Sequence, residues 1–221
     1  MTLAKPEFAA VILAAGCSSR MGTPKALLDA GGGETFLDRL AGVFLDCGCA
    51  VYAVVAGQAE EVASSARRAP EIVFVLNPDP SRGQISSLQC GLRAAAHGAA
   101  GVFFTPVDAP GVQRETVHAL QQAFGETDYV VPVFQGRRGH PVLMRVACVA
   151  EFLNPPAGAT ARDLLQARRA ATRFLEVPDS AILDDIDDPD SYAHWRKQAS
   201  HRTPGPQQRA DGGVLREEPP R

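Results

Sequence analysis

The sequence alternates short apolar runs with longer amphipathic stretches, and this alternation limits the folds open to the chain. The apolar runs are rich in β-branched and aromatic residues, which favours strands. The stretches between them carry apolar residues at three- and four-residue spacing, as helices packed on a sheet do. The predicted strands span residues 9–13, 51–55, 72–76, 102–105, 129–133, 142–144 and 174–177, and the predicted helices span 35–45, 59–68, 85–97 and 115–124. The pattern predicts an α/β fold of three layers, Rossmann-like, with a mostly parallel mixed sheet.

The length and the turn residues predict one folded domain followed by a tail. A chain of 221 residues can bury a sizeable core and falls within the range of one large domain. We place this domain at residues 1–198. Glycines and a proline between residues 136 and 141 indicate a hairpin-like insertion after residue 129. Residues 199–221 are rich in proline and glycine with few apolar side chains, so we expect a disordered C-terminal tail.

Charge and cysteine content exclude several classes of protein. The formal net charge of -3 supplies no basic field for holding nucleic acid. The five cysteines form no CxxC pair, so neither a disulfide framework nor a zinc site is indicated. The apolar stretch at residues 8–15 is too short for a membrane span. We therefore expect a cytoplasmic protein that binds neither nucleic acid nor a membrane.

A loop rich in small residues follows the first predicted strand and reads LAAGCSSRMGTPK from Leu13 to Lys25. A loop at the carboxyl end of a parallel strand faces the crevice where α/β proteins bind ligands, and small residues let backbone N–H groups approach phosphate oxygens. Arg20 and Lys25 add positive charge. The segment is neither a Walker loop nor a GxGxxG dinucleotide loop. It predicts a phosphate-binding loop of another class, against the alternative of an exposed turn.

Two acidic segments are candidates for a metal site. Asp108 follows the predicted strand at 102–105 between two prolines, in the sequence PVDAP. Mg²⁺ typically takes one or two protein carboxylates and completes its shell with phosphate oxygens and water. The alternative for Asp108 is a turn or helix-capping role. A second acidic segment, residues 184–190, would have to be brought near by folding; within it we interpret Asp188 as the N-cap of a helix that starts at Pro189.

Several of these segments together resemble one family. Residues 13–25 resemble the LAAGxSxRMGxPKxLL signature of the molybdenum cofactor cytidylyltransferases, within the MobA-like NTP transferase family of nucleotidyltransferases. Residues 185–192 resemble the family's DIDTPEDY segment, residues 77–92 its N…GxxSSLxxGL stretch, and residues 139–143 its GHPVL element. The segment PVDAP departs from the family's LGDQP pattern, which leaves the acceptor open.

The resemblance implies roles for individual residues. The loop backbone would contact base and ribose, Arg20 the β and γ phosphates, and Lys25 the α phosphate, so that Lys25, Arg20 and Asp108 are the candidate catalytic residues. Asp108 and Asp187 would hold Mg²⁺. Asp184 and Asp185 are interpreted as solvated loop charges, with contact between Asp185 and the metal as the alternative. The candidate nucleotide-binding residues are Leu13, Ala14, Ala15, Gly16, Arg20, Lys25, Gly83 and Ser87, and the candidate acceptor-binding residues are Gly139 and His140.

The function that the resemblance implies is Mg²⁺-dependent transfer of CMP from CTP to molybdopterin with release of pyrophosphate. A molybdoenzyme or its chaperone would then be a further partner. Two alternatives stay open. One is guanylyl transfer, or nucleotidyl transfer to another phosphorylated small molecule. The other is a non-catalytic chaperone that binds the molybdenum cofactor.

Overall fold

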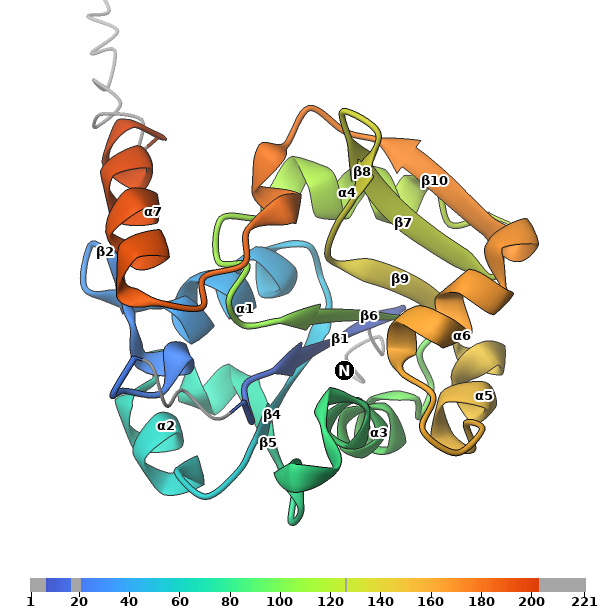
Figure 1. The fold of residues 1–221 in the computed structure, drawn as a ribbon, viewed down its shortest axis with the longest axis horizontal. Helices are drawn as coiled ribbons and strands as arrows, with labels where there is room; N and C mark the ends of the chain where they lie inside the picture. The colour runs from blue at the N-terminus through green and yellow to red at the C-terminus, as the bar shows by residue number, and fades with distance from the viewer. Residues whose placement is uncertain (1–6, 17–20, 126, 203–221) are drawn as a thin grey trace, which may run out of the picture.

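A computed structural model describes residues 7–16, 21–125 and 127–202 and contains an eight-stranded mixed sheet (Figure 1). Along the sheet the strands follow the order β10-β7-β9-β6-β1-β4-β5, and the short strand β8 (Arg137–Arg138) pairs with β7. Within this sheet of the described residues, β9 and β8 run antiparallel to their neighbours and the other pairs are parallel. The bounds are β1 Phe8–Leu13, β4 Ala50–Val55, β5 Ile72–Leu76, β6 Gly101–Pro106, β7 Tyr129–Phe134, β9 Val142–Arg145 and β10 Thr172–Glu176.

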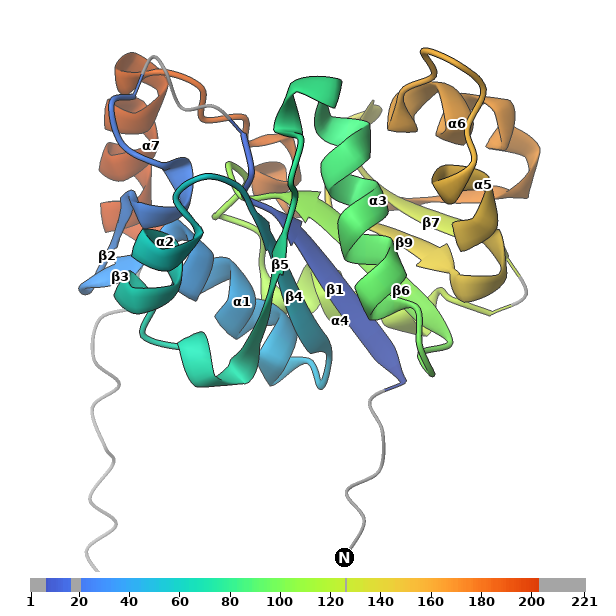
Figure 2. The ribbon, with the colours of Figure 1, turned by 90° about the horizontal axis from the view of Figure 1, so that it is seen from below.

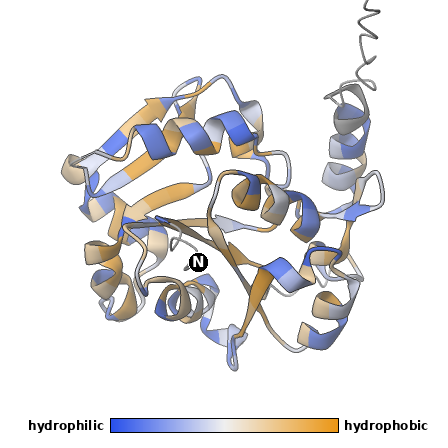
Figure 3. Cartoon of the chain, turned by 180° about the vertical axis from the view of Figure 1, so that it is seen from behind, coloured by the Kyte–Doolittle hydropathy of each residue, from blue (hydrophilic) through white to orange (hydrophobic). Residues whose placement is uncertain are grey.

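Helices cover both faces of the sheet, which gives the three predicted layers (Figures 1 and 2). One hydrophobic cluster joins one face to α1, α2 and α4, and a second joins the other face to α3, α5 and α6. Figure 3 shows apolar residues along the strands and hydrophilic residues on the outer sides of the helices. The bounds are α1 Phe36–Asp46, α2 Ala59–Ser65, α3 Gln84–Ala95, α4 Arg114–Gln122, α5 Val149–Leu153 and α6 Ala161–Ala167.

The chain order creates a switch point between β1 and β6. The strands β1, β4 and β5 are laid down side by side in that order, after which the chain returns through α3 to place β6 on the other side of β1. The two strands are parallel and in register, with Leu13 opposite Pro106. The loops that leave β1 and β6 therefore diverge from adjacent strand ends. In open α/β sheets this is where ligands bind.

The predicted elements are largely present, with differences at their ends. All seven predicted strands form, and the predicted insertion after residue 129 is the antiparallel set β7, β8 and β9. Helix α2 is shorter than expected because Ala66 is already extended and a 3-10 turn with Pro70 follows. The short hairpin of β2 (Asp29–Gly31) and β3 (Glu34–Thr35) was not anticipated.

The last helix, α7 (Pro189–Arg202), packs back on the first part of the chain. The Trp195 ring lies edge-on to Phe36 at 4.9 Å between centroids, and the Tyr192 hydroxyl donates to the Asp29 carbonyl at 2.9 Å. The helix continues to Arg202, three residues past the predicted start of the tail at residue 199. Residues 203–221 lie outside the described part of the chain, so the disordered tail stays a prediction. In the described ranges there is no helix long and apolar enough to cross a bilayer.

The four described cysteines, Cys47, Cys49, Cys90 and Cys148, are free thiols. Burial raises the pKa of Cys47 to about 11 and that of Cys49 to about 12. Only the thiolate reacts with alkylating reagents, so at pH 8 we expect iodoacetamide to modify the partly exposed Cys90 well before Cys47 or Cys49 in the native protein. Peptide mapping by mass spectrometry would measure this order. Equal labelling of Cys49 and Cys90 at pH 8 would contradict it, and unfolding in urea should remove the difference.

Candidate functional site

Lys25 reaches across the switch point to two carboxylates. It opens a 3-10 turn, η1 (Lys25–Leu27), directly after Pro24, whose extended backbone ends the loop that follows β1. The Lys25 Nζ atom donates to Asp108 Oδ2 at 2.8 Å and also to Asp187 Oδ1. The Lys25 and Asp108 side chains are each only 16% exposed, whereas Asp187 is 45% exposed. The structure thus brings together three of the side chains predicted from sequence.

Asp108 is presented by a loop whose other side chains are buried. After β6, Val107 and Ala109 point into the core and leave the intervening Asp108 carboxylate at the crevice. The Val107 N–H donates to the Leu13 carbonyl at 3.1 Å, which ties the loop to the end of β1. The alternation of apolar and acidic residues therefore fixes the direction of the carboxylate.

In the second acidic segment, a buried apolar residue again orients the neighbouring carboxylates. Ile186 is 3% exposed and its N–H donates to the Asp108 carbonyl at 3.3 Å, so the two segments are joined through their backbones. Asp185 and Asp187 flank Ile186 and point the other way. One carboxylate oxygen from each of Asp108, Asp185 and Asp187 lies within 4.8 Å of the others. The interpretation of Asp185 as a solvated loop charge is therefore incomplete, because its side chain is exposed but belongs to the cluster.

The electrostatics of the cluster favour bound positive charge. Burial and then the negative charges of Asp108 and Asp187 raise the pKa of Asp185 above its usual value. Burial opposes the charged form of Lys25, but its hydrogen bonds to Asp108 and Asp187 outweigh burial and raise its pKa. Three carboxylates and one ammonium leave an excess of negative charge in a small volume. A divalent cation with oxygen ligands matches that excess.

Gly139 packs closely against the turn before the acidic segment, a structural role that the sequence did not reveal. A Cβ atom there would lie 2.1 Å from the carbonyl oxygen of Ile182, in the turn η6 (Ser180–Leu183) that leads into the acidic segment. The next residue, His140, donates its N–H to the same carbonyl at 2.9 Å. The predicted acceptor-binding element thus positions the segment that carries Asp185 and Asp187. Contact of Gly139 with an acceptor stays a prediction.

His140 is held as a neutral side chain. Burial lowers its pKa, only partly offset by the Phe104 backbone and the charge of Asp185. Its ring lies edge-on to Phe104, with 6.4 Å between centroids. Its Nδ1 atom is buried without a hydrogen-bond partner in the described part of the chain. An uncharged ring with a buried nitrogen is poorly suited to attract an anion by charge.

Two aspartates that support the site were missed from sequence. The buried carboxylate of Asp179 accepts hydrogen bonds from Gln113 N at 3.1 Å, Thr116 Oγ1 at 2.7 Å and Ala181 N at 3.0 Å. It therefore joins the loop after β6 to η6. Asp184, interpreted as a solvated charge, instead accepts from Trp195 Nε1 at 3.1 Å. Both partners lie in other segments or in the later helix α7, so the sequence around Asp179 and Asp184 gave no signal for either contact.

Asp188 caps α7 as predicted, since its Oδ1 accepts from Ser191 N at 2.8 Å. This cap fixes the start of the helix directly after the metal-ligand candidate Asp187. Local hydrogen bonds therefore stabilise the turn between the acidic segment and α7.

The predicted base-binding residues lie at the start of α3. Gly83 precedes the helix at φ 85°, a conformation that favours glycine, and the space beside its Cα is open. Ser87 is 5% exposed and its Oγ accepts from Asn77 Nδ2 at 2.9 Å. This hydroxyl stabilises the turn between β5 and α3, and its proton and second lone pair are left for contact with a base. That contact stays a prediction.

The phosphate-binding loop is described only in part. Leu13 and Ala15 are buried, and the Ala14 N–H already donates to the Val54 carbonyl at 2.8 Å, so it is not free for a ligand. Gly16 is exposed, with nothing within 4 Å of an added Cβ. Arg20 lies outside the described residues.

The sequence is similar to a described family and to several curated proteins. The family model described as the MobA-like NTP transferase domain matches residues 10–172. A probable molybdenum cofactor guanylyltransferase of Rhodopirellula baltica is 36% identical over 56% of this chain and 59% of its own length. The molybdenum cofactor cytidylyltransferase of Escherichia coli is 25% identical over 82% of this chain and 92% of its own. The nicotine blue oxidoreductase of Paenarthrobacter nicotinovorans is 31% identical over 82% of this chain and 93% of its own.

Solved structures share the fold. The Rv0371c protein of Mycobacterium tuberculosis superposes with a TM-score of 0.75 at 25% identity, over 88% of this chain and 100% of that one. A nucleotidyl transferase from Methanothermobacter superposes with a TM-score of 0.72 at 20% identity, over 90% of this chain and 100% of that one. The predicted Rossmann-like fold of the nucleotidyltransferases is therefore confirmed.

Replacement of Gly139 by alanine tests whether the close packing of Gly139 against the Ile182 carbonyl stabilises the fold. Because the new methyl group would overlap the Ile182 carbonyl, we expect Gly139→Ala to lower the free energy of unfolding by about 1–3 kcal/mol. Urea denaturation would measure the change. The matched control is Gly57→Ala, where an added Cβ meets nothing within 4 Å. An unchanged unfolding free energy in Gly139→Ala would contradict the structural role.

Proposed function

Because this chain belongs to the MobA-like NTP transferase family, we propose that it transfers CMP from CTP to the terminal phosphate of molybdopterin and releases pyrophosphate. The observation that carries this proposal is the position of Lys25, whose ammonium lies between Asp108 and Asp187 at the switch point of the sheet. A site that combines a cation and clustered carboxylates at the carboxyl ends of parallel strands suits phosphate chemistry.

The reaction needs charge stabilisation more than proton transfer. An ionised oxygen of the acceptor phosphate attacks the α phosphorus of CTP, a phosphoanhydride bond forms, and the bond to the β phosphate breaks to release pyrophosphate. Negative charge on the α-phosphate oxygens has to be stabilised during this exchange. Lys25 supplies a positive charge that the fold has already partly removed from water. No side chain has to remove a proton from an acceptor that is already ionised.

The carboxylate cluster fits a divalent cation. Asp108 and Asp187 would hold Mg²⁺, which when bound would neutralise phosphate charge, and Asp185 offers a further oxygen within 4.8 Å. Lys25 donates hydrogen bonds to both Asp108 and Asp187. When Mg²⁺ neutralises these two carboxylates instead, the flexible Lys25 side chain can turn towards a phosphate.

Fewer observations support CTP as the donor than support nucleotidyl transfer as the reaction. Ala14-Ala15 and Gly139-His140-Pro141 resemble the cytidylyl branch, and the cytidylyltransferase relative matches most of both chains. The guanylyltransferase relative is more similar over a shorter region. We therefore propose CTP as the donor and keep GTP as the alternative.

A pyrophosphate-release assay would identify the donor. With molybdenum-bound molybdopterin and Mg²⁺ present, we expect turnover with CTP and little with GTP or ATP. Omission of Mg²⁺ with a chelator should abolish the reaction. Turnover with GTP alone would reject cytidylyl transfer while leaving nucleotidyl transfer intact, and release of pyrophosphate without the acceptor would point to plain NTP hydrolysis.

Neutralising the carboxylates tests the proposed site. Because each carboxylate contributes to the cation site, Asp108→Asn and Asp187→Asn should each lower kcat by ~100-fold or more. The matched control is Asp190→Asn, since Asp190 is an exposed acid in the first turn of α7 and lies outside the cluster. Equal activity of Asp187→Asn and Asp190→Asn would remove Asp187 from the reaction.

Two other functions make different predictions for the same variants. A non-catalytic chaperone would bind and deliver the cofactor to an apoenzyme equally well in wild type and in Asp108→Ala. The similarity to an oxidoreductase over most of its length makes redox activity a second candidate. Oxidation of NADH or NADPH with an artificial dye acceptor, undiminished in Asp108→Asn and Asp187→Asn, would favour that function over nucleotidyl transfer.

A further inference from the structure

The strand β5 lies at an open edge of the sheet and contains no charged residue. In the described part of the chain it pairs with β4 alone. Its sequence, IVFVL, includes Val73 and Leu76, which are 52% and 59% exposed and are the large apolar side chains exposed to solvent among the described residues. Soluble proteins usually protect an open edge with charged residues or a covering element. The apolar edge at β5 is therefore a candidate docking surface.

The opposite edge of the same sheet, β10, is protected by charge. It contains Arg173 and Glu176, which are both exposed. The guanidinium groups of Arg138 and Arg169 also lie over the Phe174 ring, at 4.6 and 5.1 Å from its centroid. The two edges therefore differ, and the lack of charge at β5 is a property of that strand rather than of the sheet.

The main-chain groups of β5 that face this edge can accept another strand. The Asn77 N–H, directly after β5, donates to the Val55 carbonyl of β4 at 2.8 Å. Main-chain groups alternate in direction along a strand, so the odd-numbered residues of β5 face β4, and Ile72, Phe74 and Leu76 face the open edge. The Ile72 N–H already donates to the 3-10 turn before the strand. The other N–H and C=O groups of these three residues remain for a second strand.

The two exposed side chains of β5 lie on opposite faces of the sheet. Ile72 and Phe74 pack in the cluster of α1 and α2, and Val75 packs in the cluster of α3. Because side chains alternate along a strand, Leu76 lies on the α1 side and Val73 on the α3 side. A helix docked on one face would cover one of them. A strand added to the edge would cover both, since each would gain a cross-strand neighbour.

The sequence around β5 is nearly symmetric. It reads PEIVFVLNP over residues 70–78, with Phe74 at the centre. In a two-fold interface residue i contacts residue j of the other copy and j contacts i, so a sequence that reads alike in both directions pairs like with like. In an antiparallel pair centred on Phe74, each valine lies opposite a valine, isoleucine lies opposite leucine, and the prolines end the pair on both sides. The strand thus fits a second copy of itself.

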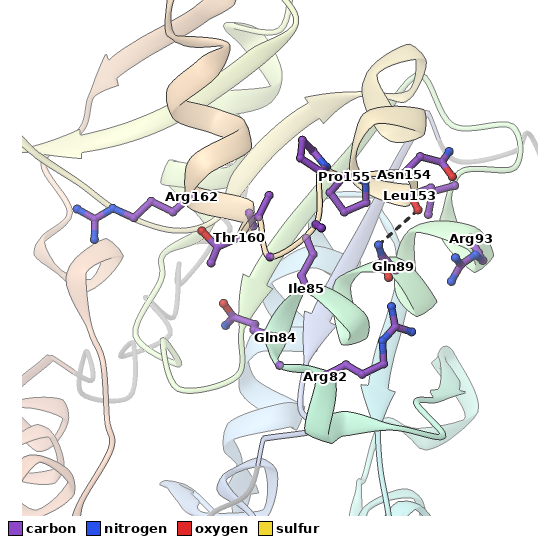
Figure 4. A pocket seen from close by; sticks show the side chains of 16 residues that line it. Arg82, Gln84, Ile85, Gln89, Arg93, Leu153, Asn154, Pro155, Thr160 and Arg162 are labelled. Carbon is purple, nitrogen blue, oxygen red and sulfur yellow. Dashed lines mark hydrogen bonds between the residues drawn. The ribbon is translucent and has the colours of Figure 1, made fainter.

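The charged residues on the two sides of β5 also favour this orientation. Arg67 and Arg68 precede the strand together with one acid, Glu71, whereas the exposed Asp79 follows it. Arg82 comes next, but it lines a cavity of about 600 Å³ between α3 and the connection from α5 to α6, and Figure 4 shows its side chain beside α3. In the antiparallel pair Asp79 of each copy approaches the two arginines of the other. Opposite charges therefore meet at both ends.

We propose that β5 pairs with β5 of a second copy of this chain, antiparallel about a two-fold axis at Phe74, so that the two sheets become one. The Phe74 N–H of each copy donates to the Phe74 carbonyl of the other, and each Leu76 N–H donates to the Ile72 carbonyl of the other. The dimer is independent of the reaction that the chain catalyses. Because a pair of five-residue strands is a small interface, its Kd is about 1–100 μM.

Sedimentation velocity on the full chain tests the dimer. Between about 1 and 500 μM we expect wild type to shift from monomer to dimer. Val73→Lys/Leu76→Lys should raise Kd about tenfold or more, because charge replaces the apolar cross-strand contacts. Both side chains are exposed, so the melting temperature should stay close to wild type. The matched control is His118→Lys/Gln122→Lys, which adds lysines at two exposed positions of α4 and should dimerise as wild type does.

Two results of this measurement would overturn the proposal. One is a wild-type chain that stays monomeric at every concentration, which would leave the edge to a strand of another protein. The other is a dimer whose Kd is the same in Val73→Lys/Leu76→Lys as in the α4 control, which would place the interface elsewhere.

A disulfide test checks the register. In the proposed pair Val73 lies opposite Val75 of the second copy with Cα atoms about 4.5 Å apart, within reach of a disulfide. Two copies of the same valine are diagonal neighbours, about 7–8 Å apart. Under oxidised glutathione, a mixture of Val73→Cys and Val75→Cys chains should therefore form a cross-linked dimer that neither variant forms alone. Peptide mapping would identify the bond.

Each cysteine variant is the control for the other, and the wild-type chain accounts for the native cysteines. A mixture that cross-links no faster than the separate variants would reject the antiparallel pair centred on Phe74.

Discussion

Mutual repulsion of three carboxylates is the constraint around which this end of the molecule is built. Asp108 lies far in the sequence from Asp185 and Asp187, and nothing in the chemistry of the three carboxylates would hold them within 4.8 Å of one another. The fold holds them by burying apolar neighbours, Ile186 among them, and by a backbone hydrogen bond between the two segments. Lys25 then compensates part of the charge. The free energy of the hydrophobic core thus supports an arrangement that is electrostatically unfavourable without a cation.

The sequence was informative where local pattern determines structure. Apolar runs located the strands because buried parallel strands need continuous apolar residues, and Asp188 was identified as a cap because its contact lies three residues away. The pattern could also place Asp108 at a strand end. Asp187 came from the family resemblance, since no local property distinguishes it from Asp190. Short elements such as β2 and β3 carry too few residues to show a period.

Contacts between distant segments could not be predicted in the same way. Asp179 accepts hydrogen bonds from both the loop after β6 and η6, and Asp184 accepts one from Trp195. In the sequence both are acids in a short segment without a clear helix or strand period, which is also how solvated loop charges look. Gly139 resembled a ligand-contacting glycine, but the reason for its missing side chain is a carbonyl group more than forty residues away, at Ile182. These roles depend on the arrangement of the sheet, which local sequence does not specify.

Because α7 packs on the first part of the chain, the site can be completed only late in synthesis. Lys25 and Asp108 leave the ribosome before Asp185 and Asp187, and Trp195 and Tyr192 fix α7 to Phe36 and Asp29 only after all four. A nascent chain that has already formed the central strands therefore lacks most of its negative cluster. The growing polypeptide cannot assemble a complete cation site until almost all of the described chain has been synthesised, so unfinished chains are electrostatically different from the mature protein.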